Sequence, residues 1–505
     1  MIPAKPDRSG AAVAVLFFVL AAAILFTRLG QGHLANFDDC YYAQKAKEMV
    51  RGGDWLTPHF AGIPRADNPP LFLWLMSIAF LAFGIHDWAA IFWSALAGSL
   101  CVPLVYLLGR RLRLDSFEAW SAAVVLLSTQ YFLKYARHAM FDVFLTFLFL
   151  VGILAYTRAA QGAVKSFLLL GLATGLGVMT KSVLGLFPLM VSVAHMLWTG
   201  RGRLLRGGWF LSGAALAALV AVPWYAAQLR LHGDAFVDEH FRWLLYRRGL
   251  GIGVGDRPWW SHFDYLRELA IVYWPWLPLA AAGTAISFQR AFAGGRPETR
   301  LPSSSAPGID WSPRDTARLL VAWLFVVVGT MSLAAEKKLW YIMSVFPCLT
   351  LFAGVAAGAW IREASRRRRV VTAGSALLGA AAIAVLLLPI PLGRARRPDL
   401  QRVALAARDR VPPGQRIANL DAPYWSTVNQ FLYYSDHDLT EPLQDPERVR
   451  ASLRSGQFAL LTREGFARVA AGESASYREV AASGGWLLVE STGPQRPRTG
   501  ATPGR

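Results

Sequence analysis

Long apolar stretches constrain the fold of this chain more than any other feature. The stretches 11–29, 167–180 and 370–392 are each long enough to cross, or nearly cross, the hydrocarbon core of a bilayer. Hydrophobic residues make up 54% of the 505 residues, and the mean hydropathy is +0.34. A soluble chain of this length has fewer long apolar runs. The sequence therefore predicts a mainly α-helical, polytopic membrane bundle.

The apolar pattern predicts about eleven crossings. They are 11–29, 88–109, 117–134, 140–158, 166–180, 182–199, 209–228, 269–288, 317–334, 339–360 and 370–392. The segment 70–84 is apolar but short, which is typical of an interfacial or re-entrant helix, or of a bent span that continues to 109.

Basic residues predict the orientation of these spans. Arg110, Arg111 and 366–369 are among the many Lys and Arg residues that collect in alternate loops. Cytoplasmic loops carry such an excess, so the N-terminus is predicted to be cytoplasmic and the C-terminus outside. This pattern also accounts for the net charge of +19. The sequence has no basic stripe interleaved with stacking aromatic residues, so a nucleic-acid partner is not predicted.

Composition divides the chain into three parts. Residues 1–394 form the predicted membrane domain, with outer loops at 30–69 and 229–268. Residues 395–492 are polar, with a helix-like piece at 445–455 and strand-like pieces at 458–461 and 486–489, which predicts a small α/β domain outside the membrane. The tail 493–505 and the cytoplasmic linker 291–316 are rich in turn-forming residues and are predicted to be disordered or flexible.

The loop 30–69 carries the first candidate for chemistry. Asp38 and Asp39 lie within a few residues of a hydrocarbon boundary, where a charge is costly unless it has a function or a partner. A carboxylate there can act as a general base toward an acceptor hydroxyl or amine. It can equally bind a cation or cap the start of the helix predicted over 41–51. Asp142, which opens a later span after Arg137, has the same two interpretations: an N-cap, or a second carboxylate that orients the acceptor.

Isolated lysines at the same predicted face form a second group. Lys181, Lys337 and Lys338 lie beside apolar helices. Snorkelling to the interface explains such lysines without any ligand. The functional alternative is capture of the phosphate of a lipid-linked substrate, for which an ammonium group is well suited.

The long outer loop 229–268 adds His240, Asp256 and Trp259. Its aromatic rings serve either as membrane anchors or as surfaces for a sugar or isoprenoid. A divalent metal held with Asp67 or His59 is left open, because no fixed ligand spacing predicts one. The sequence has no Walker loop, dinucleotide fingerprint or HExxH, so nucleotide-driven transport and zinc proteolysis have no support.

Five motifs in order resemble those of the GT-C glycosyltransferases that use polyprenyl-phosphate sugars, and especially the bacterial lipid A aminoarabinose transferases and protein O-mannosyltransferase-like enzymes. The motifs are DD-x-x-YA with GDW (Asp38, Asp39, Tyr42, Asp54), NPPL-x-x-W (Asn68 to Trp74), R-x4-D-x2-L (Arg137, Asp142, Leu145), the Lys181 turn, and KL-x-Y-x5-P (Lys338, Tyr341, Pro347). The resemblance extends over most of residues 11–360.

This resemblance implies an inverting hexosyl or pentosyl transferase, which moves a sugar from a polyprenyl-phosphate donor to a lipid, glycan or protein of the cell envelope. It implies three groups of site residues: Asp38, Asp39 and Asp142 as catalytic carboxylates; Lys181, Lys337, Lys338 and Arg137 at the donor phosphate; and Tyr42, Asp67, His240, Trp259 and Tyr341 around the substrates. Donor, acceptor and membrane lipids are the expected partners. A transporter or flippase for a lipid-linked substrate is the alternative, although the polar residues gather at one face and not at the midplane.

The chain departs from the aminoarabinose transferases at three places, one of which is the family histidine just before P-x-W of the long loop, where Gly255 or Asp256 stands here. Their first-loop pattern DE-x-RY reads Asp38-Asp39-Cys40-Tyr41-Tyr42 here, and their EKP reads Asp67-Asn68-Pro69, without the lysine. The motifs therefore support the resemblance to the family but leave the transferred sugar undetermined.

Overall fold

The structure is a computed structural model that describes residues 8–34, 38–250, 258–293, 311–388, 398–420, 424–440, 443, 445–471 and 477–492. The predicted disordered tail 493–505, most of the linker 291–316 and Asp256 lie outside the described residues.

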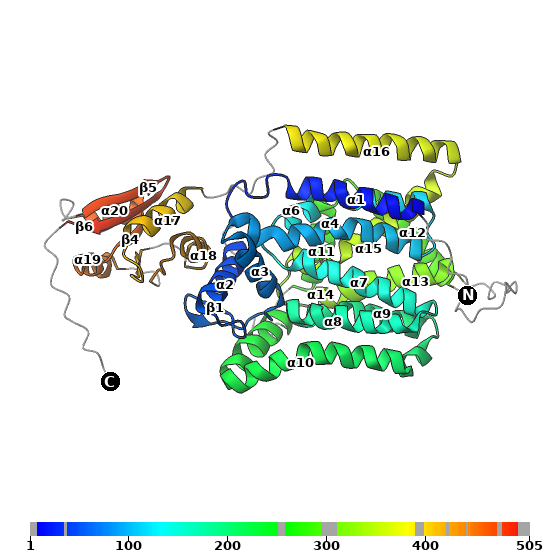
Figure 1. The fold of residues 1–505 in the computed structure, drawn as a ribbon, viewed down its shortest axis with the longest axis horizontal. Helices are drawn as coiled ribbons and strands as arrows, with labels where there is room; N and C mark the ends of the chain where they lie inside the picture. Colours follow the sequence, from blue (N-terminus) through cyan, green and yellow to red (C-terminus); the bar gives the residue numbers. More distant parts are fainter. Residues whose placement is uncertain are drawn as a thin grey trace.

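Roughly parallel and antiparallel helices form an elongated bundle that makes up most of the molecule (Figure 1). They are α1 (Arg8–Phe26), α4 (Asp87–Arg111), α5 (Ser116–Leu127), α7 (Asp142–Ala160), α8 (Phe167–Lys181), α9 (Phe187–Trp198), α10 (Gly208–Phe236), α12 (Leu277–Phe292), α13 (Pro313–Leu324), α15 (Val345–Trp360) and α16 (Ala364–Leu387). Each predicted span has a helix at its place, so the predicted helical membrane bundle is confirmed.

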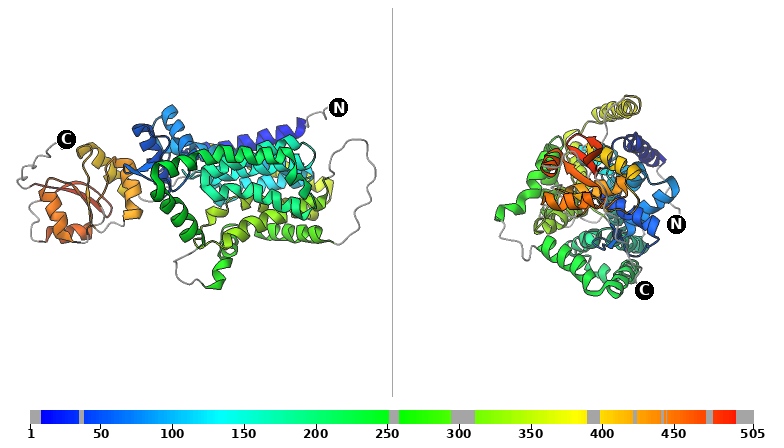
Figure 2. Two further views of the ribbon diagram at one scale, coloured as in Figure 1. Left: turned by 90° about the horizontal axis from the view of Figure 1, so that it is seen from below. Right: turned by 90° about the vertical axis from the view of Figure 1, so that its left-hand side faces the viewer.

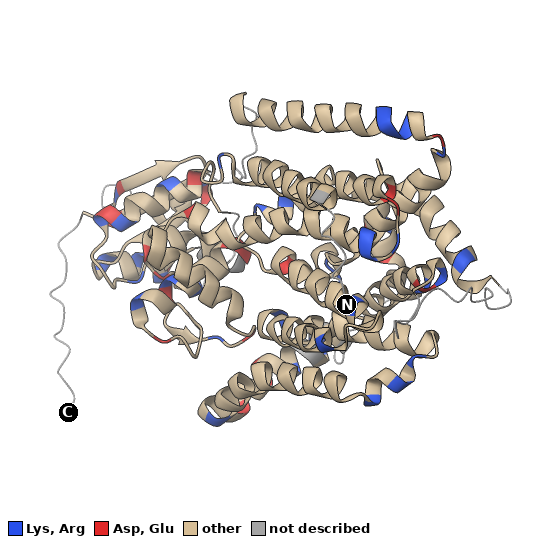
Figure 3. Ribbon diagram, turned by 45° about the vertical axis from the view of Figure 1, so that its right-hand side comes forward, with Lys and Arg blue, Asp and Glu red and all other residues tan. Residues whose placement is uncertain are grey.

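Seven segments of the described chain are long and apolar enough to cross a membrane, and one of them, Val164–Trp198, contains both α8 and α9. The helices Leu71–Phe83, Ser116–Leu127 and Val345–Trp360 are apolar but shorter. Lys and Arg recur at the helix ends far from the C-terminal domain, including the start of α16 (Figure 3). The chain is a multi-pass membrane protein; the number of crossings and their orientation remain predictions.

Glycines allow the closest contacts between these helices. A Cβ added at Gly171 of α8 would lie 1.9 Å from the carbonyl oxygen of Gly213 on α10. A Cβ at Gly283 of α12 would lie 1.8 Å from the carbonyl oxygen of Phe352 on α15. Small residues let backbones approach where apolar lipid gives helices no reason to associate by burial alone. The first of these contacts holds α8, whose last residue is Lys181, against α10, and the second holds α12 against α15.

Short elements close one end of the bundle. They are α2 (Asp38–Gly52), β1 (His59–Phe60) paired antiparallel with β2 (Ile63–Pro64), α3 (Leu71–Phe83), α6 (Gln130–Ala136), η2 (Ser182–Leu186), η4 (Val237–Leu250), η5 (Trp259–Phe263), α11 (Asp264–Val272), η6 (Phe325–Gly329), α14 (Thr330–Ser332) and η7 (Leu339–Ile342). The remaining short helices, η1 (Val164–Ser166) and η3 (Gly202–Arg206), join α7 to α8 and α9 to α10. Helices α2 and α3 lie at the end that faces the C-terminal domain (Figure 1).

The segment 229–268, expected to be a long loop, is largely helical. Helix α10 continues to Phe236 and runs on as the π-helix η4, with a kink at Gly233, where φ is +49°. The polar composition that suggested a loop instead belongs to a helix that leaves the apolar bundle and lies over the loop at Arg65–Asp67: Glu239 accepts hydrogen bonds from Arg65 and from the backbone amide of Ala66.

The C-terminal part folds around a mixed four-stranded sheet of order β3-β4-β6-β5. Its elements are α17 (Pro398–Arg410), β3 (Ala418–Asn419), α18 (Tyr424–Ser435), α19 (Pro446–Arg454), β4 (Ala459–Thr462), α20 (Arg463–Ala470), β5 (Tyr477–Ser483) and β6 (Trp486–Ser491). The pair β3–β4 is parallel, and β6 is antiparallel to β4 and β5. A small α/β fold is confirmed, while the domain boundaries remain predictions.

This α/β domain lies beyond the end of the bundle where α2 lies, at the far end from the N-terminus (Figure 2). Helix α18 meets α2, where Lys47 donates to the Tyr433 carbonyl at 2.6 Å and pairs with Asp436. The Tyr434 hydroxyl donates to Asp87 Oδ2 at 2.7 Å and accepts from the Leu34 amide at 2.9 Å. Buried polar contacts of this kind orient one unit on the other.

Candidate active site

Helix α2 begins with two carboxylates whose surroundings differ. Asp39 is buried, and its Oδ2 lies 2.9 Å from Nδ1 of His138, whose ring stacks on Tyr135. Asp38 is only half-buried. The helix dipole favours both negative charges at this N-terminus. Asp39 is therefore committed to a buried pair, and Asp38 is the carboxylate that a substrate can reach.

Tyr42 lies one turn further along α2, and the charges of nearby carboxylates affect its pKa. Burial, followed by the charges of Asp38, Asp67 and Asp142, raises the pKa of Tyr42 well above its usual value. Its ring also contacts Phe141, with centroids 4.6 Å apart. Carboxylates from the start of α2, the loop before α3 and the start of α7 thus converge on one buried ring.

Tyr135 on α6 bounds the same region from another side. Burial, together with Asp142, Asp38 and Asp39, raises the pKa of Tyr135 to about 12, against the lowering effect of its hydrogen bond with Tyr131. The charges of Asp38, Asp39 and Asp142 therefore all act on Tyr135, although Asp142 is about a hundred residues from the other two in sequence.

Lys181 and Asp142 form a buried ion pair at the centre of this region. The ammonium lies 2.5 Å from Asp142 Oδ1, with side-chain exposures of 12% and 2%. The Nζ atom also lies 4.5 Å from the ring centroid of Tyr341 and 4.7 Å from that of Phe141. Asp142 Oδ2 is buried and has no hydrogen-bond partner among the described residues. The pair therefore presents both an ammonium and an unused carboxylate oxygen.

A strained backbone holds Lys181 in place. Helix α8 ends at Lys181 because Ser182 adopts φ +46° and ψ −127°, a conformation that residues other than glycine rarely adopt. The Ser182 hydroxyl accepts from the Tyr225 hydroxyl at 3.2 Å and lies 3.2 Å from His240 Nε2. His240 Nδ1 lies 3.0 Å from the Ala66 carbonyl. Strain of this kind persists where the surroundings over-determine it, often at functional sites.

His240 is thus buried between the loop at Ala66 and the Lys181 turn. The resemblance placed it at the substrate; its contacts in the structure are those of a residue that positions Ser182 and, through it, Lys181.

Asp67 is held by side chains of α2. The buried Lys45 ammonium donates to Asp67 Oδ1, and the Tyr41 hydroxyl donates to Oδ2 at 3.1 Å. Since an ammonium already neutralises Asp67, this carboxylate is a poor metal ligand here. No group of three His, Cys, Asp or Glu in the described part of the chain is arranged to hold a metal ion. We derive no chemical step through a metal.

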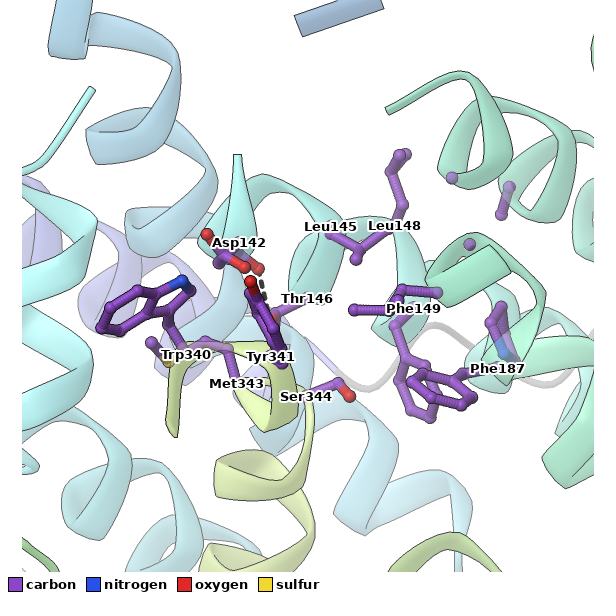
Figure 4. A pocket seen from close by; sticks show the side chains of 15 residues that line it. Asp142, Leu145, Thr146, Leu148, Phe149, Phe187, Trp340, Tyr341, Met343 and Ser344 are labelled. Carbon is purple, nitrogen blue, oxygen red and sulfur yellow. Dashed lines mark hydrogen bonds between the residues drawn. The ribbon is translucent and has the colours of Figure 1, made fainter. Parts of the chain in front are cut away.

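A narrow cleft opens beside the ion pair (Figure 4). Asp142, Trp340, Tyr341 and Ser344 line its polar side. Apolar side chains of α7, α8, η2 and α9 line the rest: Leu145, Leu148, Phe149, Ala173, Leu184, Phe187 and Pro188. Its volume is ≈ 10 Å³, about the space of one water, so its walls must part to admit a larger group. The cleft joins a charged end to an apolar one.

Three of the remaining predicted residues lie at the margin of this centre. Lys338 is nearly half-exposed, 3.9 Å from Glu336 and 5.9 Å from the ring centroid of Trp340, which in turn contacts Tyr135. Lys337 donates to the Ala334 carbonyl at 2.8 Å. Trp259 is 71% exposed. Lys338 is therefore connected to the region around Lys181 and Asp142 by its contact with Trp340, which packs on Tyr135. The exposure of Trp259 is typical of a membrane anchor.

Arg137 caps the end of α1 in this structure. Its Nη1 donates to the carbonyls of Ile24, Leu25 and Thr27, and its Nη2 to that of Arg28, over 2.7–3.2 Å. Ile24 and Leu25 lie in the last turn of α1, whose carbonyls a helix leaves without intrahelical partners, and Thr27 and Arg28 follow that turn. The guanidinium thus has a structural use at the end of α1, and its phosphate role remains a prediction.

Arg137→Lys is expected to destabilise the fold by about 2–4 kcal/mol, because one ammonium cannot replace a planar fork on four carbonyls. The measurement is the melting temperature of the purified protein in detergent, with Arg230→Lys, an exposed arginine on α10, as the matched control. An unchanged melting temperature combined with weaker donor binding would instead support the phosphate role.

Several residues of the centre carried no recognisable sequence signal. Lys45, Ser182 and Tyr225 act through contacts with segments far away in the chain. Lys45 is a partial exception, because a lysine on the buried face of an amphipathic helix needs a partner, which indicates a nearby acidic group.

Known proteins share both this fold and much of this sequence. The family described as dolichyl-phosphate-mannose-protein mannosyltransferase matches residues 11–233. The structure superimposes on ArnT from Cupriavidus metallidurans bound to undecaprenyl phosphate with a TM-score of 0.68, covering 95% of this chain and 97% of that chain at 18% identity. The predicted GT-C fold is confirmed.

Among sequences, the undecaprenyl phosphate-alpha-4-amino-4-deoxy-L-arabinose arabinosyl transferase of Pseudomonas aeruginosa is 30% identical over 375 residues, covering 70% of this chain. The corresponding protein of Pseudomonas paraeruginosa is 29% identical over 370 residues. In both cases 62% of the relative is covered, so this chain spans less than two thirds of the relatives it matches. The chain thus resembles the polyprenyl-phosphate-sugar-dependent glycosyltransferases, as its motifs predicted.

Proposed function

We propose that this protein is an inner-membrane glycosyltransferase that moves a sugar from a polyprenyl-phosphate donor to a lipid, glycan or protein acceptor on the outer face of the membrane. The observation that carries the proposal is the buried Lys181–Asp142 pair beside Asp38, at the polar end of an apolar-walled cleft. The named functions of the relatives support it.

The donor fits the charged and apolar ends of the cleft together. A lipid-linked sugar phosphate needs a cation for its phosphate and an apolar wall for its chain. Lys181 supplies the cation, and Leu145, Leu148 and Phe187 supply part of the wall. Because phosphate is the leaving group, an ammonium held in a site with little water stabilises the charge that grows on it in the transition state.

The acceptor is activated by Asp38. Its carboxylate takes the proton from the acceptor hydroxyl or amine as that atom attacks the anomeric carbon. The bond from the anomeric carbon to the phosphate oxygen breaks, and polyprenyl phosphate leaves with the electron pair. Attack from the side opposite the phosphate inverts the anomeric centre.

Two further groups position the reactants. The unused Oδ2 of Asp142 lies at the cleft and accepts a hydrogen bond from a sugar or acceptor hydroxyl, while Oδ1 holds Lys181. Asp39 and His138 fix the start of α2, so that Asp38 keeps its orientation. A carboxylate on the acceptor side and an ammonium on the phosphate side together hold the reactants in the orientation that such a displacement requires.

The flippase alternative receives no support, because the matched family and relatives are transferases. The test of the proposal is reconstitution of the purified full chain with synthetic undecaprenyl-phosphate sugars and an extract of envelope lipids, glycans and proteins, followed by mass spectrometry. A mass increment of one sugar on one acceptor, with release of undecaprenyl phosphate, is expected. Movement of donor across vesicles without any glycosylated product would overturn it.

A further inference from the structure

A second, larger cavity lies where the C-terminal domain meets the membrane bundle. Its volume is ≈ 440 Å³. On the bundle side it is lined by the loop after α1 at Gly30, the second half of α2, and the turn between α3 and α4 with the start of α4. On the side of the C-terminal domain it is lined by α17, α18 and Asp436, the residue directly after α18. It is separate from the cleft at Asp142, since the two share no lining residue.

Positive charge is in excess on the wall of this cavity. Lys47, Arg51 and Arg408 line it, against Asp87 and Asp436. Both carboxylates are engaged: Asp436 by Lys47 and Arg51, and Asp87 by the Tyr434 hydroxyl. Arg408 pairs at 3.5 Å with Asp409, which does not line the cavity, and the side chains of Arg51 and Arg408 are 54% and 51% exposed.

The local field agrees with this excess. Burial lowers the pKa of Lys47, and the charges of Arg51 and Arg408 lower it further, against the raising effect of Asp436. An anion in the cavity would be attracted by the positive charges of Lys47, Arg51 and Arg408, which all line it.

Apolar surface continues from the cavity in the direction of the membrane. Ile85 and Trp88 line the cavity itself. Helix α3, which ends just before this turn, exposes Ile78, Leu81 and Phe83, and the Phe83 ring packs 5.0 Å from that of Trp88. An indole beside exposed guanidinium groups, above an apolar helix face, is the arrangement found at the headgroup level of a bilayer.

We propose that this cavity binds the phosphate-bearing headgroup of an anionic phospholipid, whose chains lie along the exposed face of α3. Arg51 and Arg408 contact the phosphate, and Trp88 lies at the level of the glycerol backbone. Because the cavity wall comes from both α2 and α17, the bound lipid fastens the C-terminal domain to the bundle. The inference rests on the fold and does not depend on the transfer reaction.

The test counts phospholipids that stay bound to the delipidated full-length protein in native mass spectrometry, after incubation with phosphatidylglycerol, phosphatidylcholine or inorganic phosphate. Wild type is expected to retain one phosphatidylglycerol in preference to phosphatidylcholine. Arg51→Gln/Arg408→Gln is expected to lower the apparent affinity by about tenfold, since basic side chains at the surface supply much of the attraction to anionic lipid.

Arg402→Gln is the matched control, because Arg402 lies on the same helix α17, is 72% exposed and does not line the cavity. Arg408→Gln alone keeps the pairing of Arg51 with Asp436 and is expected to show part of the loss, so a folding defect of the double variant does not hide the effect. Equal retention by wild type and both variants would overturn the proposal. Binding of inorganic phosphate without preference for phosphatidylglycerol would overturn the assignment to a lipid.

Discussion

Asp38→Asn is expected to lower the rate of sugar transfer by roughly 10²–10⁴-fold, the range that a positioned general base contributes. The amide keeps the shape and the polar surface of the carboxylate but cannot take the acceptor's proton. Asp38 is half-buried at the first residue of α2, so the substitution removes a favourable charge from a helix N-terminus and little packing. The fold is expected to survive.

The measurement is single-turnover transfer from a synthetic undecaprenyl-phosphate sugar, with the melting temperature in detergent recorded in parallel. Asp54→Asn is the matched control: Asp54 lies in the same loop region, accepts from the nearby amides of Leu56 and Thr57, and has its Oδ2 3.8 Å from Nδ1 of His59. Its transfer rate is expected to stay within about twofold of wild type. Near-normal turnover of Asp38→Asn would remove Asp38 as the base.

Asp39→Asn separates the two neighbouring carboxylates. Asp39 is buried against His138, so the substitution replaces a charged acceptor beside a buried imidazole with the weaker, neutral oxygen of an amide. The expected result is a lower melting temperature and a moderate loss of transfer, in contrast to Asp38→Asn, in which only transfer falls.

The central carboxylates and lysine were predictable because of the physics of the membrane boundary. A charged side chain next to hydrocarbon is costly, so Asp38, Asp142 and Lys181 stand out against their apolar neighbours. The same contrast of apolar and polar residues predicted the bundle and the α/β domain. The predicted strand pieces 458–461 and 486–489 lie within a residue or two of β4 and β6.

The partners of these charges were not predictable, because tertiary packing selects them. Asp39 meets His138 across 99 positions, and Lys47 meets Asp436 across nearly four hundred. Neither pair follows a helical or strand spacing, so no local period indicates it. The strain at Ser182 also arises from distant contacts, those of Tyr225 and His240. Arg137 shows the opposite case: a motif position suggested a ligand contact, whereas the fold uses it as a cap.

Removal of the Lys181 ammonium is expected to weaken donor binding by roughly 10–100-fold, since hydrogen bonds that involve charged groups are the strong ones. Acceptor binding is expected to change far less. Lys181→Met alone, however, leaves the Asp142 carboxylate buried without its partner, and breaking such a pair costs about 3–5 kcal/mol of stability. A loss of donor binding in that single variant therefore does not separate a ligand role from a folding role.

The double variant Lys181→Met/Asp142→Asn separates them. It removes both charges and keeps similar volumes, a change that is often neutral for stability. Its melting temperature is expected to return close to that of wild type, while the dissociation constant for undecaprenyl phosphate stays raised. Lys338→Gln is the comparison variant, because Lys338 is a more exposed lysine at the same end of the bundle. It is expected to raise the dissociation constant for undecaprenyl phosphate by less than the double variant does. If the double variant melts like wild type and also binds undecaprenyl phosphate like wild type, Lys181 is a structural residue, and the donor phosphate must be held elsewhere.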